Sequence, residues 1–229
     1  MKVIVLLGFL AVAMNATLAY GGVTIDRVPG TRNITSALDE SIVTDGELMA
    51  GMSVSAYFAD STSESVTWVS SAASSGLAQG VNWSLSQSGN TWDQDWTLDN
   101  QTGQPLVGLV LDAGDGNAVF DTISASDFTP GSGKGKPLTM TSGDPSLDIL
   151  ATYYDEVALV GELPVGDLYR CLRIDFLNAG QFGSGSTMTF MTDTDSLATA
   201  GDIHPVPEPS VLVLLSMLGA LGVAAWRRR

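Results

Sequence analysis

Acidic residues in glycine-rich turns are the side chains of this sequence best suited to chemistry. Asp112, Asp115 and Asn117 lie in one glycine-rich segment directly after an apolar stretch, and Asp193 and Asp195 form a second acidic pair. Carboxylate and amide oxygens are the ligands that Ca²⁺ prefers, although these residues do not follow the spacing of an EF-hand. Distant loops converge at the ends of a β-sandwich, so these five residues are candidate ligands of one calcium ion. The alternative is a set of solvated turn aspartates.

A second role open to paired carboxylates is the hydrolysis of glycosidic bonds. That reaction needs two carboxyl groups about 5–9.5 Å apart across a cleft. No pattern in the sequence indicates a cleft, so a secreted glycoside hydrolase remains the weaker alternative.

Trp92 and Trp96 are candidates for contact with a saccharide. In one extended strand these two residues would face the same side, and Asp93 and Asp95 lie between them. Exposed rings would stack on sugars, whereas buried rings would belong to the core. The sequence leaves both interpretations open.

Nucleophiles and general bases are scarce. The single histidine, His204, lies in a proline-rich stretch, which offers neither a fixed partner nor a sheltered pocket. The single cysteine, Cys171, lies in an apolar stretch, where a buried thiol is expected. Arg170 and Arg173 beside it leave a reactive thiol as the alternative. We therefore predict no catalytic residue and a protein that is not an enzyme.

Short strands separated by turns must position these groups. Periodicity predicts strands at 53–58, 65–69, 81–86, 91–98, 106–111, 118–120, 147–154, 168–177 and 187–191. Turns rich in Gly, Asn, Ser and Pro separate them. This pattern predicts an all-β fold: a single, jelly-roll-like β-sandwich domain over residues 20–192, followed by a linker over residues 193–206.

Composition excludes several classes of function. The 229 residues include 25 acids and 10 bases, for a net charge of −15. Residues 20–206 hold 24 of the acids and 6 of the bases, so that segment alone carries −18. Nucleic-acid binding depends on clustered Lys and Arg, so we expect no nucleic-acid partner. One cysteine excludes an intrachain disulfide and any multi-cysteine metal site.

Residues 1–19 are typical of a secretory signal peptide. Lys2 is followed by an almost unbroken apolar run from Val3 to Met14, and small residues at Thr17 and Ala19 precede a predicted cleavage point. The sequence therefore predicts export.

The C-terminal segment combines three features in order. Pro207, Glu208 and Pro209 come first, then the apolar run 211–226, and then Arg227, Arg228 and Arg229. The run predicts one transmembrane helix, and the arginines predict a cytoplasmic C-terminus with the body outside. Two prolines around one residue favour an extended chain that a processing enzyme can reach.

This order of features resembles the PEP-CTERM sorting signal of Gram-negative bacteria, over residues 207–229. The resemblance implies that an exosortase, an integral membrane enzyme with a cysteine nucleophile, recognises Pro207, Glu208 and Pro209. It implies an inner-membrane precursor with its body in the periplasm, followed by delivery to the cell surface or the extracellular space. Such proteins accompany exopolysaccharide production and biofilm or floc formation.

These observations predict an exported structural or adhesive component linked to exopolysaccharide. The expected partners are the exosortase, the inner membrane and exopolysaccharide. A carbohydrate-binding module is the first alternative, and the glycoside hydrolase is the second.

Overall fold

The computed structural model describes residues 22–29, 33–123, 128–178 and 182–206. The predicted signal peptide and the sorting segment 207–229 lie outside these residues. Among the described residues, no helix is long and apolar enough to span a membrane. The predicted helix at 211–226 lies outside them as well.

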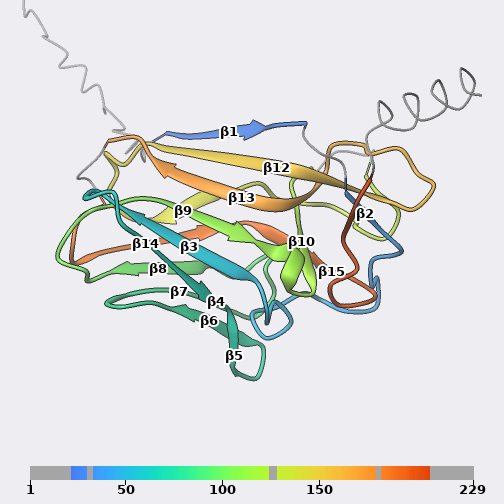
Figure 1. Cartoon of the computed structure of the whole chain (residues 1–229), viewed down its shortest axis with the longest axis horizontal. Helices are drawn as coiled ribbons and strands as arrows, with labels where there is room; N and C mark the ends of the chain where they lie inside the picture. The colour runs from blue at the N-terminus through green and yellow to red at the C-terminus, as the bar shows by residue number, and fades with distance from the viewer. Residues whose placement is uncertain (1–21, 30–32, 124–127, 179–181, 207–229) are drawn as a thin grey trace, which may run out of the picture.

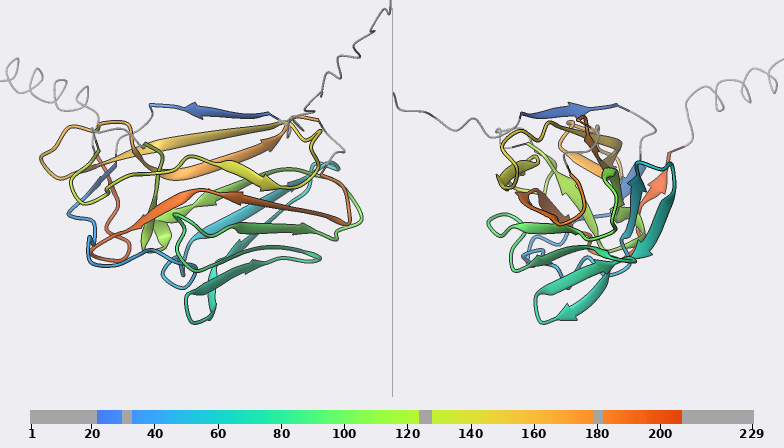
Figure 2. Two further views of the ribbon diagram at one scale, coloured as in Figure 1. Left: turned by 180° about the vertical axis from the view of Figure 1, so that it is seen from behind. Right: turned by 90° about the vertical axis from the view of Figure 1, so that its left-hand side faces the viewer.

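The described chain folds into two β-sheets that pack face to face (Figures 1 and 2). The all-β sandwich predicted from the sequence is therefore confirmed. The smaller sheet has the order β11-β14-β8-β7-β6-β5. The larger sheet follows the path β16-β2-β12-β13-β9-β3-β4, with β1 beside β12, β10 beside β13, and β15 beside β10.

The strands of the larger sheet are β1 (Val23–Arg27), β2 (Asn33–Thr35), β3 (Ser53–Phe58), β4 (Ser63–Thr67), β9 (Leu106–Asp112), β10 (Ala118–Asp121), β12 (Ile149–Leu159), β13 (Leu168–Phe176), β15 (Asp193–Ser196) and β16 (His204–Pro205). Those of the smaller sheet are β5 (Val69–Ala72), β6 (Ser75–Gln79), β7 (Trp83–Ser88), β8 (Trp96–Asn100), β11 (Thr139–Ser142) and β14 (Ser186–Met191). One 3₁₀ turn, η1 (Ala113–Asp115), connects β9 to β10.

Each of the nine predicted strands has a counterpart, although several boundaries shift. β12 continues to Leu159, beyond the predicted end at 154. The predicted strand 65–69 is divided at the buried Trp68 into β4 and β5, which belong to different sheets. The predicted strand 91–98 begins only at Trp96, because residues 91–94 form a turn. Strands β1, β2, β6 and β11 escaped prediction because they are short and rich in polar residues or glycine.

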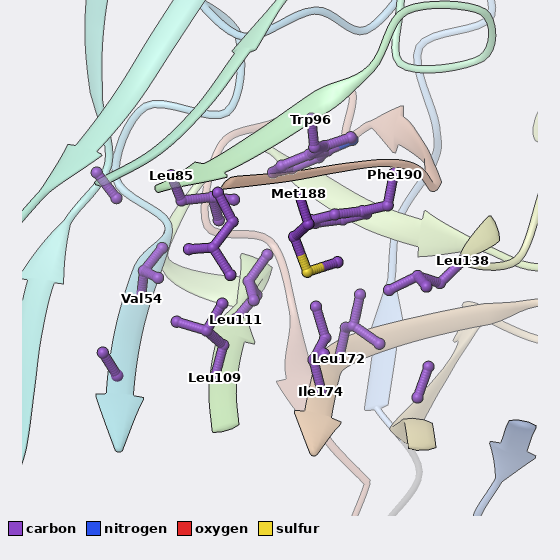
Figure 3. Close-up of a cluster of buried hydrophobic side chains, with 14 of the residues drawn as sticks. Val54, Leu85, Trp96, Leu109, Leu111, Leu138, Leu172, Ile174, Met188 and Phe190 are labelled. Carbon is purple, nitrogen blue, oxygen red and sulfur yellow. The ribbon is translucent and has the colours of Figure 1, made fainter. Parts of the chain in front are cut away.

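The core lies between the two sheets and follows the alternation of side chains along the strands. In β7 and β8, every second residue is buried, beginning with Trp83 and Trp96. Figure 3 shows Leu172 and Ile174 of the larger sheet facing Met188 of the smaller one, and Leu109 facing Leu85. This interdigitation of the two inner faces is the main apolar contact of the fold.

β13 changes partner along one of its edges. β12 occupies one edge of β13 from Tyr169 to Phe176. The other edge pairs with β9 from Cys171 to Asp175 and with β10 at Leu168 and Tyr169. Beyond β13, the larger sheet therefore divides into a branch formed by β9, β3 and β4 and a branch formed by β10 and β15.

The segment 193–206 is part of the sandwich, and the prediction of a linker there is wrong. β15 pairs with β10 over all four of its residues, and β16 pairs with β2. Leu197 and Ile203 are buried in a second, smaller apolar cluster. The acidic composition of the segment suggested a solvated loop, but here the acids of a paired strand are largely enclosed.

Candidate functional site

Three aspartates gather where the chain passes from one sheet to the other. Asp121 ends β10, and Asp193 and Asp195 lie in β15. Each offers one carboxylate oxygen, and these three atoms lie within 4.8 Å of one another. Among the residues that the structure describes, this is the one group of three or more Asp, Glu, His or Cys side chains gathered in this way.

Strand register brings the three carboxylates together. In the antiparallel pair of β10 and β15, Asp121 lies opposite Asp193 and Val119 lies opposite Asp195. Directly opposite residues, and alternate residues along a strand, point to the same face of a sheet. Asp121 and Asp193 therefore form a cross-strand pair, and Asp195 lies diagonally from Asp121 on the same face.

The cluster has few hydrogen-bond donors. Asp121 has no exposed surface; its Oδ1 accepts from the Ile123 amide at 3.2 Å, and its Oδ2 is buried without a partner. The Oδ2 of Asp195 is also buried without a partner. Asp193 Oδ1 accepts from the Thr91 hydroxyl at 3.1 Å.

A glycine-containing loop covers Asp121. A Cβ atom at Gly135 would overlap the Asp121 carboxylate, so only glycine fits this close approach. The Lys136 amide donates to the Asp121 carbonyl at 3.0 Å, and the Lys136 carbonyl accepts from the Asp193 amide at 2.9 Å. Lys136 thus holds the loop across both β10 and β15.

The neighbouring basic side chain does not neutralise the cluster directly. Lys136 Nζ donates to the Trp92 carbonyl and lies 4.5 Å above the centre of the Trp92 ring. Among the described residues, no ion pair involves Asp121, Asp193 or Asp195. Three carboxylates therefore share one partly enclosed space without a direct ion pair, although Lys136 acts on Asp193 through its charge and Lys134 lines the adjacent pocket.

Burial raises the pKa values of all three carboxyls, and repulsion from neighbouring carboxylates adds to the shift of Asp121 and Asp195. Loss of hydration raises the pKa of Asp121 to about 8, and the charges of Asp167 and Asp193 act in the same direction. Loss of hydration likewise raises the pKa of Asp195 to about 9, with Asp121 and Asp193 adding to it. The pKa of Asp193 rises to about 7 through burial, opposed in part by Thr91 and Lys136.

Asp167 shows what a satisfied buried carboxylate looks like in this fold. It too has no exposed surface. Its two oxygens accept from the amides of Thr129 and Leu168 and from the Thr129 hydroxyl, the last at 2.8 Å. Such donors stabilise an ionised carboxylate. The cluster has few of them, so its charge must be relieved by a bound proton or a bound cation.

A pocket of about 180 Å³ connects the cluster to the solvent. Its lining includes Asp193, Asp195, Asn90, Trp92 and Lys134. The site is therefore enclosed on the Asp121 side and open on the β15 side.

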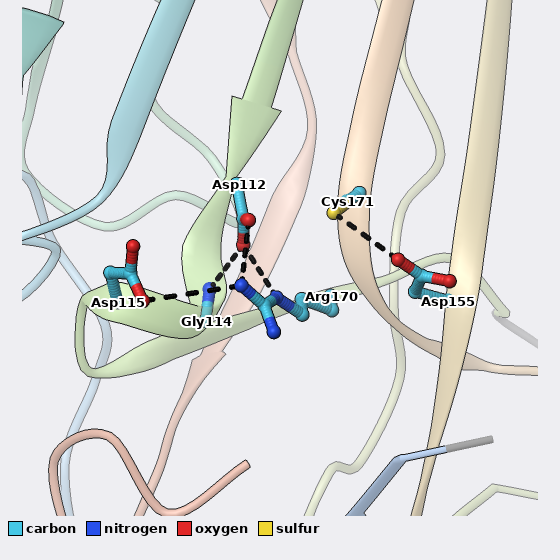
Figure 4. Close-up of polar contacts among 6 residues, drawn as sticks. All are labelled: Asp112, Gly114, Asp115, Asp155, Arg170 and Cys171. Carbon is cyan, nitrogen blue, oxygen red and sulfur yellow. Dashed lines mark hydrogen bonds and ion pairs between the residues drawn. The ribbon is translucent and has the colours of Figure 1, made fainter. Parts of the chain in front are cut away.

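The structure gives the Asp112 loop a different role from the one predicted. Asp112 Oδ1 and Oδ2 accept from Arg170 Nε and Nη2, both at 2.7 Å, and Oδ1 also accepts from the Gly114 amide (Figure 4). Asp115 lies 4.0 Å from the same guanidinium. These carboxylates neutralise Arg170, which lies where β13 changes partner from β9 to β10.

The five predicted calcium ligands are thus divided between two places. Asp112 and Asp115 contact Arg170, whereas Asp193 and Asp195 lie with Asp121. Asn117 precedes β10; its carbonyl accepts from the Leu197 amide at 3.1 Å, and its side-chain oxygen is buried without a partner. The sequence-based analysis missed Asp121, whose only signal was an acid at the end of a short apolar strand.

The two candidate tryptophans do not share a face. Trp96 is fully buried; its ring stacks on Phe190 and its Nε1 donates to the Thr192 carbonyl at 3.0 Å. The prediction of Trp96 as a saccharide contact is therefore wrong. Trp92 is half-buried in the turn before β8, and the Lys136 ammonium lies above its ring.

The structure also shows the surroundings of the single cysteine, Cys171, and the single histidine, His204. Cys171 is buried in β13, and burial, with the charges of Asp112 and Asp155, raises its pKa to about 12 (Figure 4). Its thiol therefore stays protonated at neutral pH. His204 lies exposed on β16 and pairs with Asp202 at 3.2 Å.

Comparison with known proteins identifies the end of the chain. Residues 205–229 match the family model of the PEP-CTERM protein-sorting motif, which confirms the resemblance stated above. The motif marks an exported protein whose membrane-anchored precursor is sorted by an exosortase to the cell surface. Pro207, Glu208, Pro209 and the terminal arginines Arg227, Arg228 and Arg229 belong to this match and lie outside the described residues. No curated protein and no solved structure matches the chain.

The contacts of Arg170 predict which of two aspartates supports the fold. Asp112→Ala removes the two-point contact with Arg170 and leaves this partly enclosed guanidinium without its main partner. We expect the free energy of unfolding in urea to fall by about 1–3 kcal/mol. Asp175→Ala is the matched control, because Asp175 also pairs with an arginine of β13 but that arginine, Arg173, is half exposed. It should lose less than about 1 kcal/mol. Equal losses would contradict the role assigned to Asp112.

The raised pKa values predict that metal-free protein loses stability as pH rises. An unfolded aspartate has a pKa of about 3.9, so between pH 5 and 8 the folded cluster binds more protons than the unfolded chain. The free energy of unfolding must then fall with pH, by up to about 1.4 kcal/mol per pH unit for each proton held only in the folded state. Urea midpoints measured in a chelator should decrease over this range. Asp195→Asn should flatten the decrease, and a stability that rises from pH 5 to 8 would contradict the cluster's protonation.

Proposed function

Because residues 205–229 are a PEP-CTERM sorting motif, we propose that this exported chain is a non-enzymatic structural or adhesive component of the extracellular matrix, associated with exopolysaccharide. The observation that carries the proposal is the position of the motif. It begins at Pro205, where the last strand of the sandwich ends. Processing at the motif would therefore deliver the whole sandwich.

The placement of the reactive side chains supports a role without catalysis. The Cys171 thiol is buried and protonated, and a nucleophilic cysteine must be an accessible thiolate. Asp121 has no surface that a substrate could reach. Its carboxylate and those of Asp193 and Asp195 lie on neighbouring strands, closer together than a glycosidase pair that must hold a sugar between its members.

The outer surface supports a role in contact with a hydrated matrix. In β4, the exposed side chains are Ser63, Ser65 and Thr67, and all four residues of β5 are exposed. β4 ends the path of the larger sheet, and β5 ends the smaller sheet. Hydroxyl groups and the backbone of such edge strands can bond to polymers or to further strands.

Net charge sets a condition on the matrix partner. Residues 20–206 carry −18, and a chain of this charge repels an anionic polymer unless cations bridge the two. An association with acidic exopolysaccharide should therefore depend on divalent cations, whereas an association with a neutral one should not.

The sorting step predicts the fate of a motif variant. Replacing Pro207, Glu208 and Pro209 by alanine removes the residues that the exosortase recognises, so the full-length precursor should accumulate in the membrane fraction. Immunoblots of membrane, surface and medium fractions measure this. Glu162→Ala combined with Pro164→Ala alters the same residue types in an exposed loop of the sandwich and should leave sorting unchanged. Surface delivery of the triple variant at the normal level would refute sorting through the motif.

The matrix role predicts binding without turnover. The full chain, purified in detergent, should co-sediment with the host's exopolysaccharide, and the length of the polymer should remain unchanged after incubation. Shortening of the polymer would contradict the non-enzymatic role and favour a hydrolase. Binding lost in Trp92→Ala would assign the contact to a carbohydrate-binding site at the pocket, and absence of any co-sedimentation would refute the matrix association.

A further inference from the structure

We propose that Asp121, Asp193 and Asp195 bind one divalent cation, and that the cation is Ca²⁺. The proposal concerns the folded body alone and does not depend on the matrix role. It replaces the ligand set expected from the sequence, in which Asp112, Asp115 and Asn117 stood in the place of Asp121.

The geometry of the carboxylates fits a single ion. Ca²⁺ binds oxygen at about 2.3–2.6 Å, so two oxygens on the same ion lie at most about 5 Å apart. The three carboxylate oxygens lie within 4.8 Å of one another. They come from both strands of a hydrogen-bonded pair, which fixes their spacing through the backbone before any ion arrives.

An orphaned oxygen inside the site points to a ligand independently of the cluster's charge. Asp121 has no exposed surface, and its Oδ2 has no hydrogen-bond partner. A buried polar atom without a partner costs free energy. Thr129 and Leu168 supply several donors to the buried Asp167 nearby, whereas no donor reaches the Oδ2 atom of Asp121 or of Asp195.

The surroundings allow a cation to enter and to complete its coordination. The pocket beside Asp193 and Asp195 gives access from the solvent. Asp193, Asp195 and Lys134 are among its lining residues, whereas Asp121 is fully buried and does not line it. Ca²⁺ takes 6–8 oxygen ligands and accepts water among them, so three carboxylates and water from the pocket can satisfy it.

The donor set selects the kind of metal. The cluster offers carboxylate oxygens and contains neither histidine nor cysteine. Softer ligands favour zinc and copper, whereas carboxylates favour calcium, magnesium and manganese. Mg²⁺ demands near-ideal octahedral geometry at 2.0–2.1 Å and usually binds few protein carboxylates. Three carboxylates fixed by strand register therefore suit Ca²⁺ better.

A bound ion would join two strands that lie beneath one covering loop. β10 contributes Asp121, β15 contributes Asp193 and Asp195, and the loop around Gly135 and Lys136 covers both strands. The ion would relieve the repulsion among the carboxylates and link β10 to β15 beneath that loop. We therefore expect binding to raise the stability of the sandwich.

The test is calcium titration of the full chain, purified in detergent and treated with a chelator. Calorimetry should show one site per chain, with a dissociation constant on the order of 10⁻⁴–10⁻³ M, as for other extracellular calcium modules. At a tenfold excess over that constant, the melting temperature should rise by roughly 2–5 °C. Tb³⁺ should bind in the same place and luminesce when tryptophan is excited, because Trp92 lines the pocket.

Matched variants decide where the ion binds. Asp195→Asn should abolish the thermal shift and the Tb³⁺ signal, and Asp121→Asn should do the same if it folds. Asp112→Asn removes an acid of the loop expected from the sequence and should keep both responses. The proposal is overturned if Asp112→Asn abolishes the response while Asp195→Asn keeps it, if only Mg²⁺ produces the shift, or if wild-type protein shows neither heat nor shift with Ca²⁺.

Discussion

The need of one strand, β13, to serve two partners on the same edge shapes the rest of this sandwich. β9 pairs with its C-terminal part and β10 with its N-terminal end, so the chain must leave the sheet and return within a few residues. The 3₁₀ turn η1 makes that detour. Asp112 begins it by accepting from the Gly114 amide, while both of its oxygens accept from Arg170. Arg170 stands between the last residue paired with β9 and the first paired with β10, so this contact fixes the point where the sheet divides.

That division is what creates the carboxylate cluster. Without β10 as a separate strand, β15 would have no partner in the larger sheet, since it pairs with β10 alone among the described strands. β15 is also the continuation of β14, which belongs to the smaller sheet. Between these two strands lies Thr192. Its carbonyl accepts a hydrogen bond from Trp96 of the smaller sheet, and its hydroxyl forms one with the hydroxyl of Tyr153 of the larger sheet. The crossing is thus anchored in the core, and this anchor places the aspartates that follow it.

Periodicity and turn residues predicted most of the strands, but they did not predict which residues form the carboxylate cluster. Alternation revealed strands such as β3, β7 and β9 because their inner residues, among them Val54 and Leu85, are large and apolar. β15 was predicted to be part of a linker because all four of its residues are polar, although Asp193, Thr194 and Ser196 are buried, so no apolar residue in its sequence marks a buried face. Asp121 was overlooked for a related reason: its importance comes from lying opposite Asp193, and strand register across more than seventy residues of chain is not visible in local sequence. The Asp112 loop was misleading in the opposite direction, because its partner, Arg170, is also distant in the sequence.

The sorting signal and the cluster are linked by the environment to which the chain is sent. A buried group of carboxylates is a liability where nothing binds it, since each unpaired charge must be desolvated. An exported protein instead folds among divalent cations, and a site of weak affinity suffices when the ion is abundant. Gathering Asp121, Asp193 and Asp195 without an ion would then destabilise the fold mainly before the protein has been exported. Because the last strand ends where the sorting motif begins, the same short segment of chain that closes the sandwich after β15 also leads into the signal that determines where the protein is delivered.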